Sequence, residues 1–352
     1  MSLHPTPMGA VPEETVRVAR AAFPKGNVYL QMRDLLGGIY DDAQFADLFA
    51  PRGRPVEAPW RLALVTVMQF AEGLSDRQAA EAVRGRIDWK YALGLELVDP
   101  GFDFSVLCAF RARLVAGSAE HRLLDALLEA CKQQGYLKAR GRQRTDSTHV
   151  LGALRVLNRI ERVAETLRAA LNVLARQAPE WSREWVPAEW YERYGRRIEE
   201  DRLPKGQEAR ATYLTQVGAD GQQLLSALEA SATPETLRHL PEVELLRAVW
   251  QQQLAVSKDE AWQVRDPKGM PAASDLIESP YEAEARYATK RDLHWVGYKV
   301  HLTGTCDNEA PHLITQVETT IAPATDREQL ARIQEALAER ALLPAEHMVD
   351  AG

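Results

Sequence analysis

The sequence predicts a mainly α-helical N-terminal domain, followed by an α/β core with a mixed sheet that a helical insertion interrupts. Three observations predict this class. Apolar residues recur at helical spacing as far as about Leu137 and again after Val156. Alternation typical of strands is confined to the region after Tyr287, and a further short strand is expected at Asp146. The intervening residues 179–286 are polar and are broken by proline and glycine.

The composition is that of an ordinary globular protein. Of 352 residues, 45% are hydrophobic and 26% are charged, which excludes disordered, collagen-like and disulfide-scaffold classes. Cys108, Cys131 and Cys306 lie far apart without a CxxC pair, so we expect small buried side chains in a reducing compartment. No stretch reaches the ~18 apolar residues of a membrane span, and no signal peptide is visible, so we expect a cytoplasmic location.

Local turn and capping signals divide the N-terminal region into helices. Helices are expected at Trp60–Phe70, at Asp76–Val83 after an N-cap at Ser75, after an N-cap at Ser105, and at Glu120–Cys131. The helix after Ser105 carries Arg111 and Arg113, which would suit phosphates in a helix-turn-helix. A plain helical bundle with solvated arginines is the alternative, and the pattern alone favours it.

The net charge of −7 is unevenly distributed. Residues 131–168 carry nine basic and three acidic residues, whereas residues 179–286 carry 13 basic and 20 acidic residues. Arg140, Arg142 and Arg144 of the basic stretch come immediately before Asp146. Such a basic island attracts polyanions, above all nucleic acids, although a solubilising surface is the alternative.

The insertion is predicted to be helical. Apolar residues from Val156 to Leu174 recur at spacings of three and four, as in a long amphipathic helix. Trp181, Trp185, Trp190 and Tyr191 then crowd a short segment. These rings could stack on nucleic-acid bases, but we favour packing within a small subdomain.

The sequence pattern of the C-terminal region is typical of an α/β fold with a sheet. Strands are expected at residues 294–302, 312–321 and 346–350, with a helix opened by a capping box at Thr325–Glu328 before the last of them. In the first of these strands Tyr298 lies on one face, and Lys299 and His301 lie on the other.

Two carboxylates stand out by position. Asp146 and Asp350 each end a short predicted strand, and strand ends meet at one edge of a sheet. Two aspartates brought together there can hold Mg²⁺, which accepts carboxylates, water and phosphate oxygens. Two such ions can activate a water or a hydroxyl and neutralise the leaving oxygen in phosphodiester transfer. The alternative for either residue is a turn or an N-cap.

Several motifs taken together resemble bacterial insertion-sequence transposases of the DDE kind. The matching blocks are Arg142–Val150 with Asn158-Arg159, then Pro280-Tyr281, Ala285–Tyr287, Lys290-Arg291 and Trp295–Thr303, and finally His347–Gly352. The helices with Phe104-Ser105 and Phe110–Leu114 are similar to an InsH-type N-terminal domain of that family. The resemblance extends from about Phe23 to Gly352.

The resemblance implies a ribonuclease-H-like core that cuts and joins DNA with Mg²⁺ or Mn²⁺ held by Asp146 and Asp350. It implies double-stranded DNA partners (element terminal repeats and target DNA), a homo-oligomer on DNA, and a nucleoid-associated place in a bacterial cytoplasm. The corresponding domains are a helical DNA-binding domain at 1–137, the first core strand at 138–155, the helical insertion at 156–286, and the remaining core at 287–352.

The expected DNA contacts come from both lines of reasoning. From the residues themselves we expect Arg111, Arg113, Arg140, Arg142 and Arg144, and the resemblance adds Arg286, Lys290, Arg291, Lys299 and His301. Tyr298 would lie near DNA, with strand packing as the favoured alternative. His149 could orient a phosphate or make a structural hydrogen bond.

Some positions depart from the family pattern. Asp292 and Gly304 stand where a glycine and an acidic residue are common, and the third catalytic acid, a downstream Glu, is missing after Asp350. We therefore expect a fragment that is inactive alone and, with an open sheet edge, marginally soluble. Glu199 or Glu200 could substitute for the missing acid. The competing functions are a non-enzymatic DNA-binding regulator and a metal-dependent nuclease or phosphatase.

Overall fold

A computed structural model describes residues 2–50, 52–53, 55–138, 140–153, 157–230, 233–256 and 262–349. The chain forms two compact units. The first comprises Met1–Arg144, Gly304–Thr315 and Gln334–Met348, and the second comprises Thr145–Thr303, Gln316–Ile333 and Val349–Gly352.

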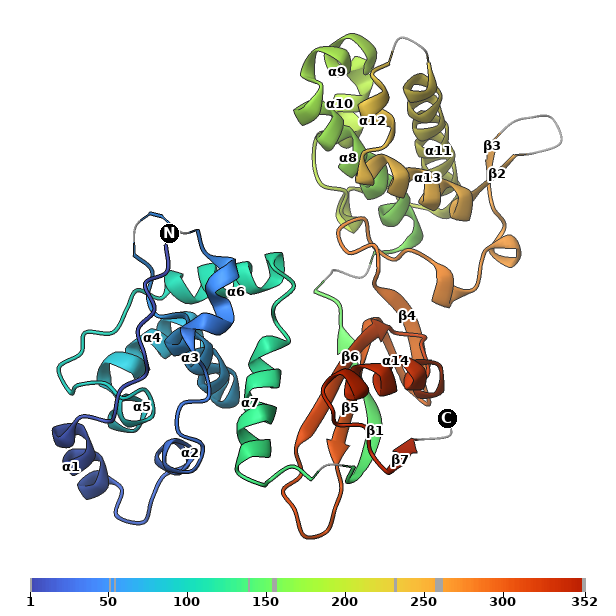
Figure 1. The fold of residues 1–352 in the computed structure, drawn as a ribbon. Helices are drawn as coiled ribbons and strands as arrows, with labels where there is room; N and C mark the ends of the chain where they lie inside the picture. The colour runs from blue at the N-terminus through green and yellow to red at the C-terminus, as the bar shows by residue number, and fades with distance from the viewer. Residues whose placement is uncertain are drawn as a thin grey trace. The chain divides into compact units, whose positions relative to one another are not determined.

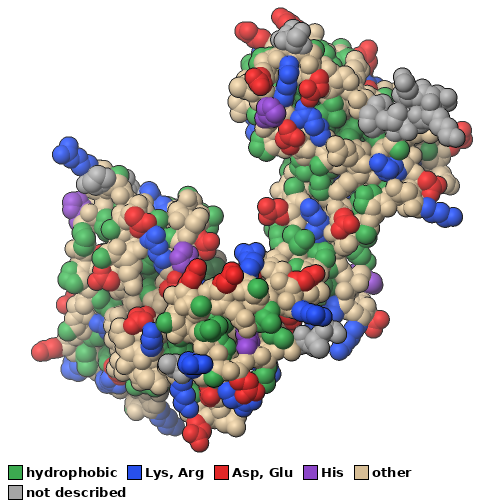
Figure 2. All heavy atoms as spheres, turned by 45° about the vertical axis from the view of Figure 1, so that its right-hand side comes forward, with side chains coloured by type: hydrophobic (Ala, Val, Ile, Leu, Met, Phe, Trp, Pro, Cys, Tyr) green, Lys and Arg blue, Asp and Glu red, His purple; other side chains and the backbone are tan. Residues whose placement is uncertain are grey.

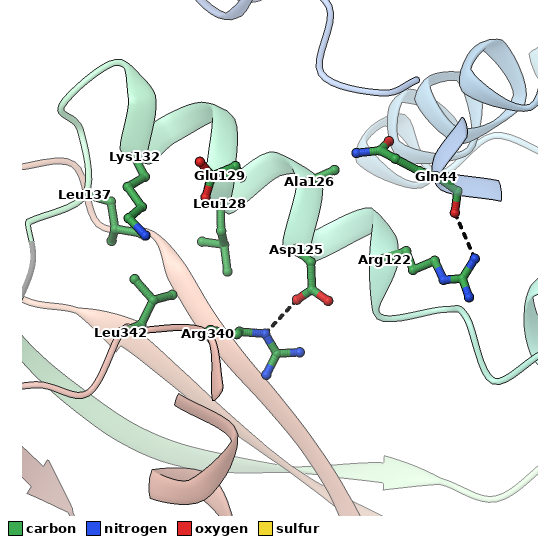
Figure 3. Close-up of a pocket in the computed structure, with 10 residues that line it drawn as sticks. All are labelled: Gln44, Arg122, Asp125, Ala126, Leu128, Glu129, Lys132, Leu137, Arg340 and Leu342. Carbon is green, nitrogen blue, oxygen red and sulfur yellow. Dashed lines mark hydrogen bonds and ion pairs between the residues drawn. The ribbon is translucent and has the colours of Figure 1, made fainter. Parts of the chain in front are cut away.

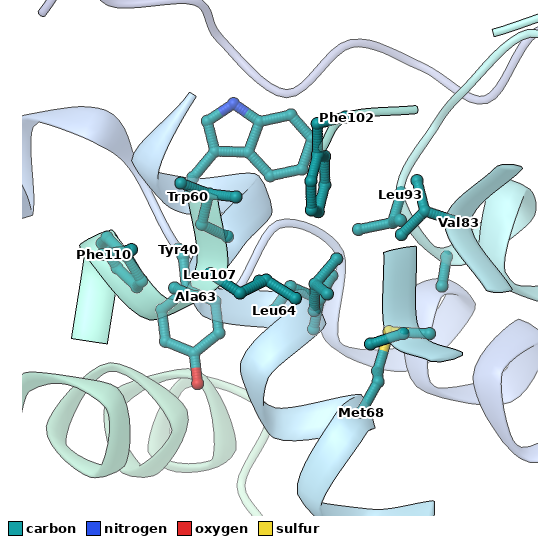
Figure 4. Packing of buried hydrophobic residues seen from close by; sticks show 14 of the residues in the cluster. Tyr40, Trp60, Ala63, Leu64, Met68, Val83, Leu93, Phe102, Leu107 and Phe110 are labelled. Carbon is teal, nitrogen blue, oxygen red and sulfur yellow. The ribbon is translucent and has the colours of Figure 1, made fainter. Parts of the chain in front are cut away.

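The N-terminal part is helical, as predicted (Figure 1). Its elements are α1 (Glu13–Ala22), α2 (Val28–Leu36), η1 (Asp42–Leu48), α3 (Pro59–Glu72), α4 (Asp76–Gly85), α5 (Ile87–Ala92), α6 (Ser105–Ala116) and α7 (Arg122–Gln133). Trp60, Leu64 and Met68 of α3 pack in the centre of this core, together with Phe102 and Phe110 (Figure 4). Burial of such large side chains supplies about 1.5–3 kcal/mol each relative to exposure, so α3 anchors the domain.

The four predicted helices are present, although most of their ends are shifted by one or two residues, and one of the two predicted N-caps is wrong. Ser75 caps α4 in a capping box with Gln78. Ser105 is not the N-cap of α6; it is the first helical residue, and Phe104 precedes it as N-cap. The reason is local, because the Asp103 carboxylate accepts hydrogen bonds from both the backbone N and the hydroxyl of Ser105.

The three cysteines differ in exposure. Cys131 is buried, as expected, and burial raises the pKa of its thiol. Cys306 is half-buried. The expectation of a buried side chain is wrong for Cys108, which lies exposed on α6.

The insertion is built on α8 (Arg159–Gln177), which Asn158 caps together with Glu161. Its other elements are α9 (Pro179–Trp185), α10 (Ala188–Tyr194), η2 (Glu200–Arg202), α11 (Gln207–Glu229), α12 (Glu235–Arg238), α13 (Pro241–Gln253), β2 (Leu254–Val256), β3 (Trp262–Val264), η3 (Pro267–Gly269) and η4 (Ala273–Asp275). The antiparallel β2–β3 hairpin was not expected from the sequence. Val156, the first residue of the predicted apolar stripe, lies outside the described residues.

The tryptophans of the insertion pack against one another, which confirms the favoured interpretation. Trp181 stacks on Trp185 at 5.5 Å between ring centroids. Trp185 then meets Trp190 edge-on at 5.5 Å, and Trp190 meets Tyr194 at 5.9 Å. Trp190 is buried within the core of the insertion.

The sheet contains β1 (Arg142–Leu151), β4 (Arg286–Lys290), β5 (Leu293–Thr305), β6 (Ile314–Ile321) and β7 (Glu346–Val349), and α14 (Asp326–Glu339) connects β6 to β7. The strand order is β4-β5-β1-β7, and β6 also pairs with β5. β4 and β5 are antiparallel. Cys306 N donates to Arg142 O and Gly152 N donates to Val296 O, so β1 and β5 are antiparallel as well.

β7 is parallel to β1, whereas β5 is antiparallel to it. Ala345 N donates to the carbonyl oxygens of Arg140 and Gly141, just before β1 begins. Because β7 pairs with β1 and continues from this point to Val349, the two strands run in the same direction. The sheet is therefore mixed, as predicted.

Gly297 allows β1 and β5 to approach closely. Its φ is +154°, and a Cβ placed there would collide with the backbone of residues 150–152, including Leu151 C at 2.9 Å. Only glycine fits this position without moving a strand.

Candidate functional site

Asp146 lies in the middle of β1 rather than at its end, so the expected strand-end position is wrong. β1 extends over ten residues because it pairs with the long strand β5. Along β1, Gln143 and Thr145 are buried, whereas Arg144 and Asp146 are exposed. The Asp146 carboxylate accepts a hydrogen bond from the adjacent Ser147 N at 2.9 Å. An exposed carboxylate in this position is accessible to a cation or a polar ligand.

Asp350, the other expected metal ligand, lies outside the described residues. The described part of β7 ends at Val349. At the start of the strand, Arg142 pairs with the Glu346 carboxylate at 2.9 Å.

A cleft of about 910 Å³ lies between β4, β5 and the beginning of α14. Its charged lining residues are Lys290, Arg291, Lys299, Asp326 and Arg327. Cations therefore outnumber anions, and the Asp326 carboxylate is already engaged by a histidine of β5. We call this hollow the β4–α14 cleft. On the face of the molecule in Figure 2, side chains of both charges are interspersed.

The β4–α14 cleft and Asp146 lie on opposite faces of the sheet. Ser147 lines the cleft, and successive side chains of a strand point to opposite sides. The structure therefore brings Lys290, Arg291 and Lys299 together but does not bring them to Asp146.

Lys299 and His301 contact residues at and just before the N-terminus of α14. Lys299 Nζ donates to Ala324 O at 2.5 Å, and burial lowers the pKa of its ammonium group. His301 is completely buried, with Nδ1 at 2.7 Å from Asp326 Oδ1 and Nε2 at 2.9 Å from Thr320 Oγ1. Both side chains thus contact protein groups here, and their contact with DNA stays a prediction.

Two other residues of β5 and β1 contact protein groups as well. Tyr298 is half-buried, and burial together with a hydrogen bond to Glu282 raises the pKa of its phenol to about 12. The His149 ring lies against Trp295 at 5.6 Å between centroids.

The candidate arginines of the N-terminal domain have protein partners. Arg111 donates to both oxygens of Asp76 at 2.9 and 2.7 Å, and the pair is only partly exposed. The guanidinium of Arg113 lies 5.2 Å from the centre of the Phe49 ring and 3.5 Å from Leu48 O. These contacts stabilise the helical core, and DNA binding by either residue stays a prediction.

The remaining candidate arginines differ in how they are held. Arg286 donates to the backbone oxygens of residues 283 and 285. Arg142 is paired with Glu346, whereas Arg140 and Arg144 are exposed. Arg291 is exposed too, and it occupies the left-handed region at φ +56° in the turn that joins β4 to β5.

Sequence reasoning missed Arg327. It lines the β4–α14 cleft from the first turn of α14. The predicted capping box of Thr325 with Glu328 is present and was the available signal, because it places the two residues between them, Asp326 and Arg327, at a helix N-terminus.

A separate cavity of about 460 Å³ lies against α7 in the first unit (Figure 3). Leu128, Leu137 and Leu342 supply apolar surface. Two of its charged side chains are joined by a hydrogen bond of 2.6 Å from Arg340 to Asp125. These two charges therefore satisfy each other within the cavity.

The substitutes considered for a third acid are not gathered into a metal centre. Glu200 pairs with Arg210 and accepts a hydrogen bond from Asn158. Within the ranges that the structure describes, no three His, Cys, Asp or Glu side chains are placed to hold a metal ion. In the same ranges, no helix is both long and apolar enough to cross a bilayer.

Residues 17–113 match a family model described as "Transposase domain (DUF772)". This match covers α2 to most of α6 and supports a transposase family, a class of DNA-processing enzymes. No curated protein and no solved structure match the chain.

Proposed function

We propose that the chain is the DNA transposase of a bacterial insertion sequence, and that it cuts and joins phosphodiester bonds at the ends of its element. The transposase-domain match to residues 17–113 carries the proposal. An exposed aspartate, Asp146, on a strand of a mixed sheet supports it, as in the DDE-type, ribonuclease-H-like core that the sequence motifs resemble.

In this proposal Asp146 and Asp350 hold Mg²⁺ or Mn²⁺. The Asp146 carboxylate is exposed, and its hard oxygens suit such an ion. When bound, the ion would lower the pKa of a water or hydroxyl and neutralise the leaving oxygen.

The β4–α14 cleft would bind the DNA backbone. Lys290, Arg291 and Arg327 are exposed cations on its lining, and each can pair with a phosphate oxygen. The cleft and Asp146 face different sides of the sheet, so the cleft would anchor DNA rather than orient the scissile phosphate.

Separate assays for metal and for DNA test this function. Mn²⁺ binding is measured by electron paramagnetic resonance for the wild type, Asp146→Asn, Asp350→Asn and the exposed turn variant Glu309→Gln. Both aspartate variants are expected to lose at least ten-fold in affinity, and Glu309→Gln is expected to match the wild type. Mn²⁺ binding retained by Asp146→Asn would contradict the assigned ligand.

DNA binding is measured by fluorescence anisotropy with duplexes that contain the sequence flanking the gene. The logarithm of the affinity should fall steeply with the logarithm of salt concentration, because phosphate contacts release counterions. A flat response would contradict the proposal.

A non-enzymatic DNA-binding regulator is the second candidate. The transposase-domain match favours it only in that residues 17–113, which it covers, lie in the helical N-terminal part and do not include Asp146. It predicts specific binding to element ends that neither Mg²⁺ nor Asp146→Asn changes. The enzymatic function instead predicts that strand transfer requires Mg²⁺ and is lost in Asp146→Asn.

A further inference from the structure

A second basic pocket lies in the helical insertion. It has a volume of about 560 Å³ and is formed by the end of α10, the segment leading to η2, and the first turns of α11. Its charged lining residues are Arg193, Arg196, Arg197, Arg202 and Glu192. Four arginines against one glutamate contrast with the acidic excess of the insertion as a whole.

Three of these arginines have no counter-charge among the residues that the structure describes. Arg196, Arg197 and Arg202 are exposed, and their side chains form no ion pair with any residue that the structure describes. Elsewhere in the insertion, Arg210 pairs with Glu200, and Arg247 pairs with Glu229 and with a second glutamate. Like charges gathered without partners repel one another. An anion that enters this pocket reduces that repulsion, so its binding is electrostatically favourable.

The fourth arginine is held in place at the wall of the pocket. Arg193 pairs with the buried carboxylate of Asp220 at 3.0 Å. Its Nε is buried and makes no hydrogen bond with the described residues. An unsatisfied buried donor of this kind costs about 1–3 kcal/mol.

The lining also presents aromatic and apolar surface. Tyr191 is 57% exposed at the edge of the pocket, and Tyr213 is half-buried beside it. The neighbouring tryptophans are engaged with one another, so Tyr191 is the ring of this segment that is free to stack. Unpaired guanidinium groups beside an exposed ring are typical of surfaces that bind nucleic-acid strands.

We propose that this pocket is a second DNA-binding site, in which Arg196, Arg197 and Arg202 bind backbone phosphates and Tyr191 stacks on a base. The inference rests on the proposed function, because it takes DNA as the polyanion. Guanidinium groups suit this ligand because they bind phosphate through two parallel hydrogen bonds. An acidic protein segment would use the same charges but would not require the exposed ring.

The test compares DNA affinity of the full chain over a range of salt concentrations. The triple variant Arg196→Gln/Arg197→Gln/Arg202→Gln should bind at least ten-fold more weakly at 100 mM salt. Its slope of log affinity against log salt should be shallower by about 2–3, since each lost phosphate contact removes about 0.9 for duplex DNA. Arg183→Gln removes an exposed charge from α9 outside the pocket and should change neither quantity.

Tyr191→Ala tests the stacking contribution. It should weaken binding to single-stranded or unpaired element ends by five-fold or more while leaving the salt slope unchanged, because a stacked ring neutralises no phosphate. The exposed positions of all these side chains should preserve folding, which unchanged thermal unfolding would verify. The single variant Arg197→Gln, with an expected slope change of about 0.9, replaces the triple variant if that one unfolds.

The outcomes separate the two proposals. In one outcome the wild type binds DNA, Lys290→Ala/Arg291→Ala weakens that binding, and the arginine variants keep the wild-type salt slope. This outcome overturns the inference about the pocket and leaves the proposed function standing. Arginine variants that keep DNA affinity but lose binding of a polyglutamate peptide assign the pocket to an acidic protein instead. A wild type that binds no DNA overturns both proposals.

Discussion

Gly297→Ala should separate β1 from β5 and lower stability substantially. A non-glycine residue at φ +154° costs about 1–3 kcal/mol in backbone strain. The added Cβ would also collide with the backbone of β1, including Leu151 C at 2.9 Å, so one strand must move. Movement would break the 2.9 Å hydrogen bond from Gly152 N to Val296 O, worth about 1 kcal/mol. We therefore expect a loss of about 3 kcal/mol.

Gly304→Ala, on the same strand, is the matched control. The nearest atom to its added Cβ is Leu313 O at 3.4 Å, an ordinary contact, and the backbone there is not left-handed. Thermal unfolding followed by circular dichroism should show Gly297→Ala melting roughly 6 °C lower or more, at about 2 °C per kcal/mol. Gly304→Ala should stay within about 2 °C of the wild type. Equal melting temperatures for the two variants would refute the steric argument.

Two histidines provide further tests. His301→Ala leaves Asp326 and Thr320 without their buried partner, so it should lower the free energy of urea unfolding by about 2–4 kcal/mol. It should also speed amide exchange in the first turn of α14. A loss of stability below about 0.5 kcal/mol would contradict a structural role for His301. Burial lowers the pKa of His347 from its usual 6.5, so the imidazole is held neutral in the fold. The unfolded chain then takes up the proton first as pH falls through 6.5, and stability is lost. His347→Gln should flatten the decline in melting temperature between pH 7 and 5, while exposed His312→Gln should leave it unchanged; the reverse order would show that His347 does not contribute.

Elements that begin or repeat with a local sequence signal could be predicted from the sequence. The capping boxes that begin at Ser75 and Thr325 are formed by residues three positions apart, so their geometry depends on nothing distant. The alternating residues of β5 and the apolar stripe of α8 were recognisable for the same reason. The β2–β3 hairpin was not, because three-residue strands carry too few residues for a period to appear.

The position of Asp146 within its strand could not be predicted. The residues of β1 from Arg142 to His149 are all polar, so no apolar alternation reveals where the strand ends. Its length comes from pairing with β5, which lies about 150 positions later in the chain. A short strand was therefore inferred where a long one forms.

The sequence by itself determined the helical N-terminal domain, the basic island before Asp146 and the local caps, because each depends on neighbouring residues. Only the tertiary structure decided which charges are available to a ligand. Arg111 is bound by Asp76, which is 35 positions away, whereas Arg196 in an acidic insertion has no counter-charge among the described residues. The physical reason is that an ion pair forms within about 4 Å in space, and distance along the chain does not predict that separation.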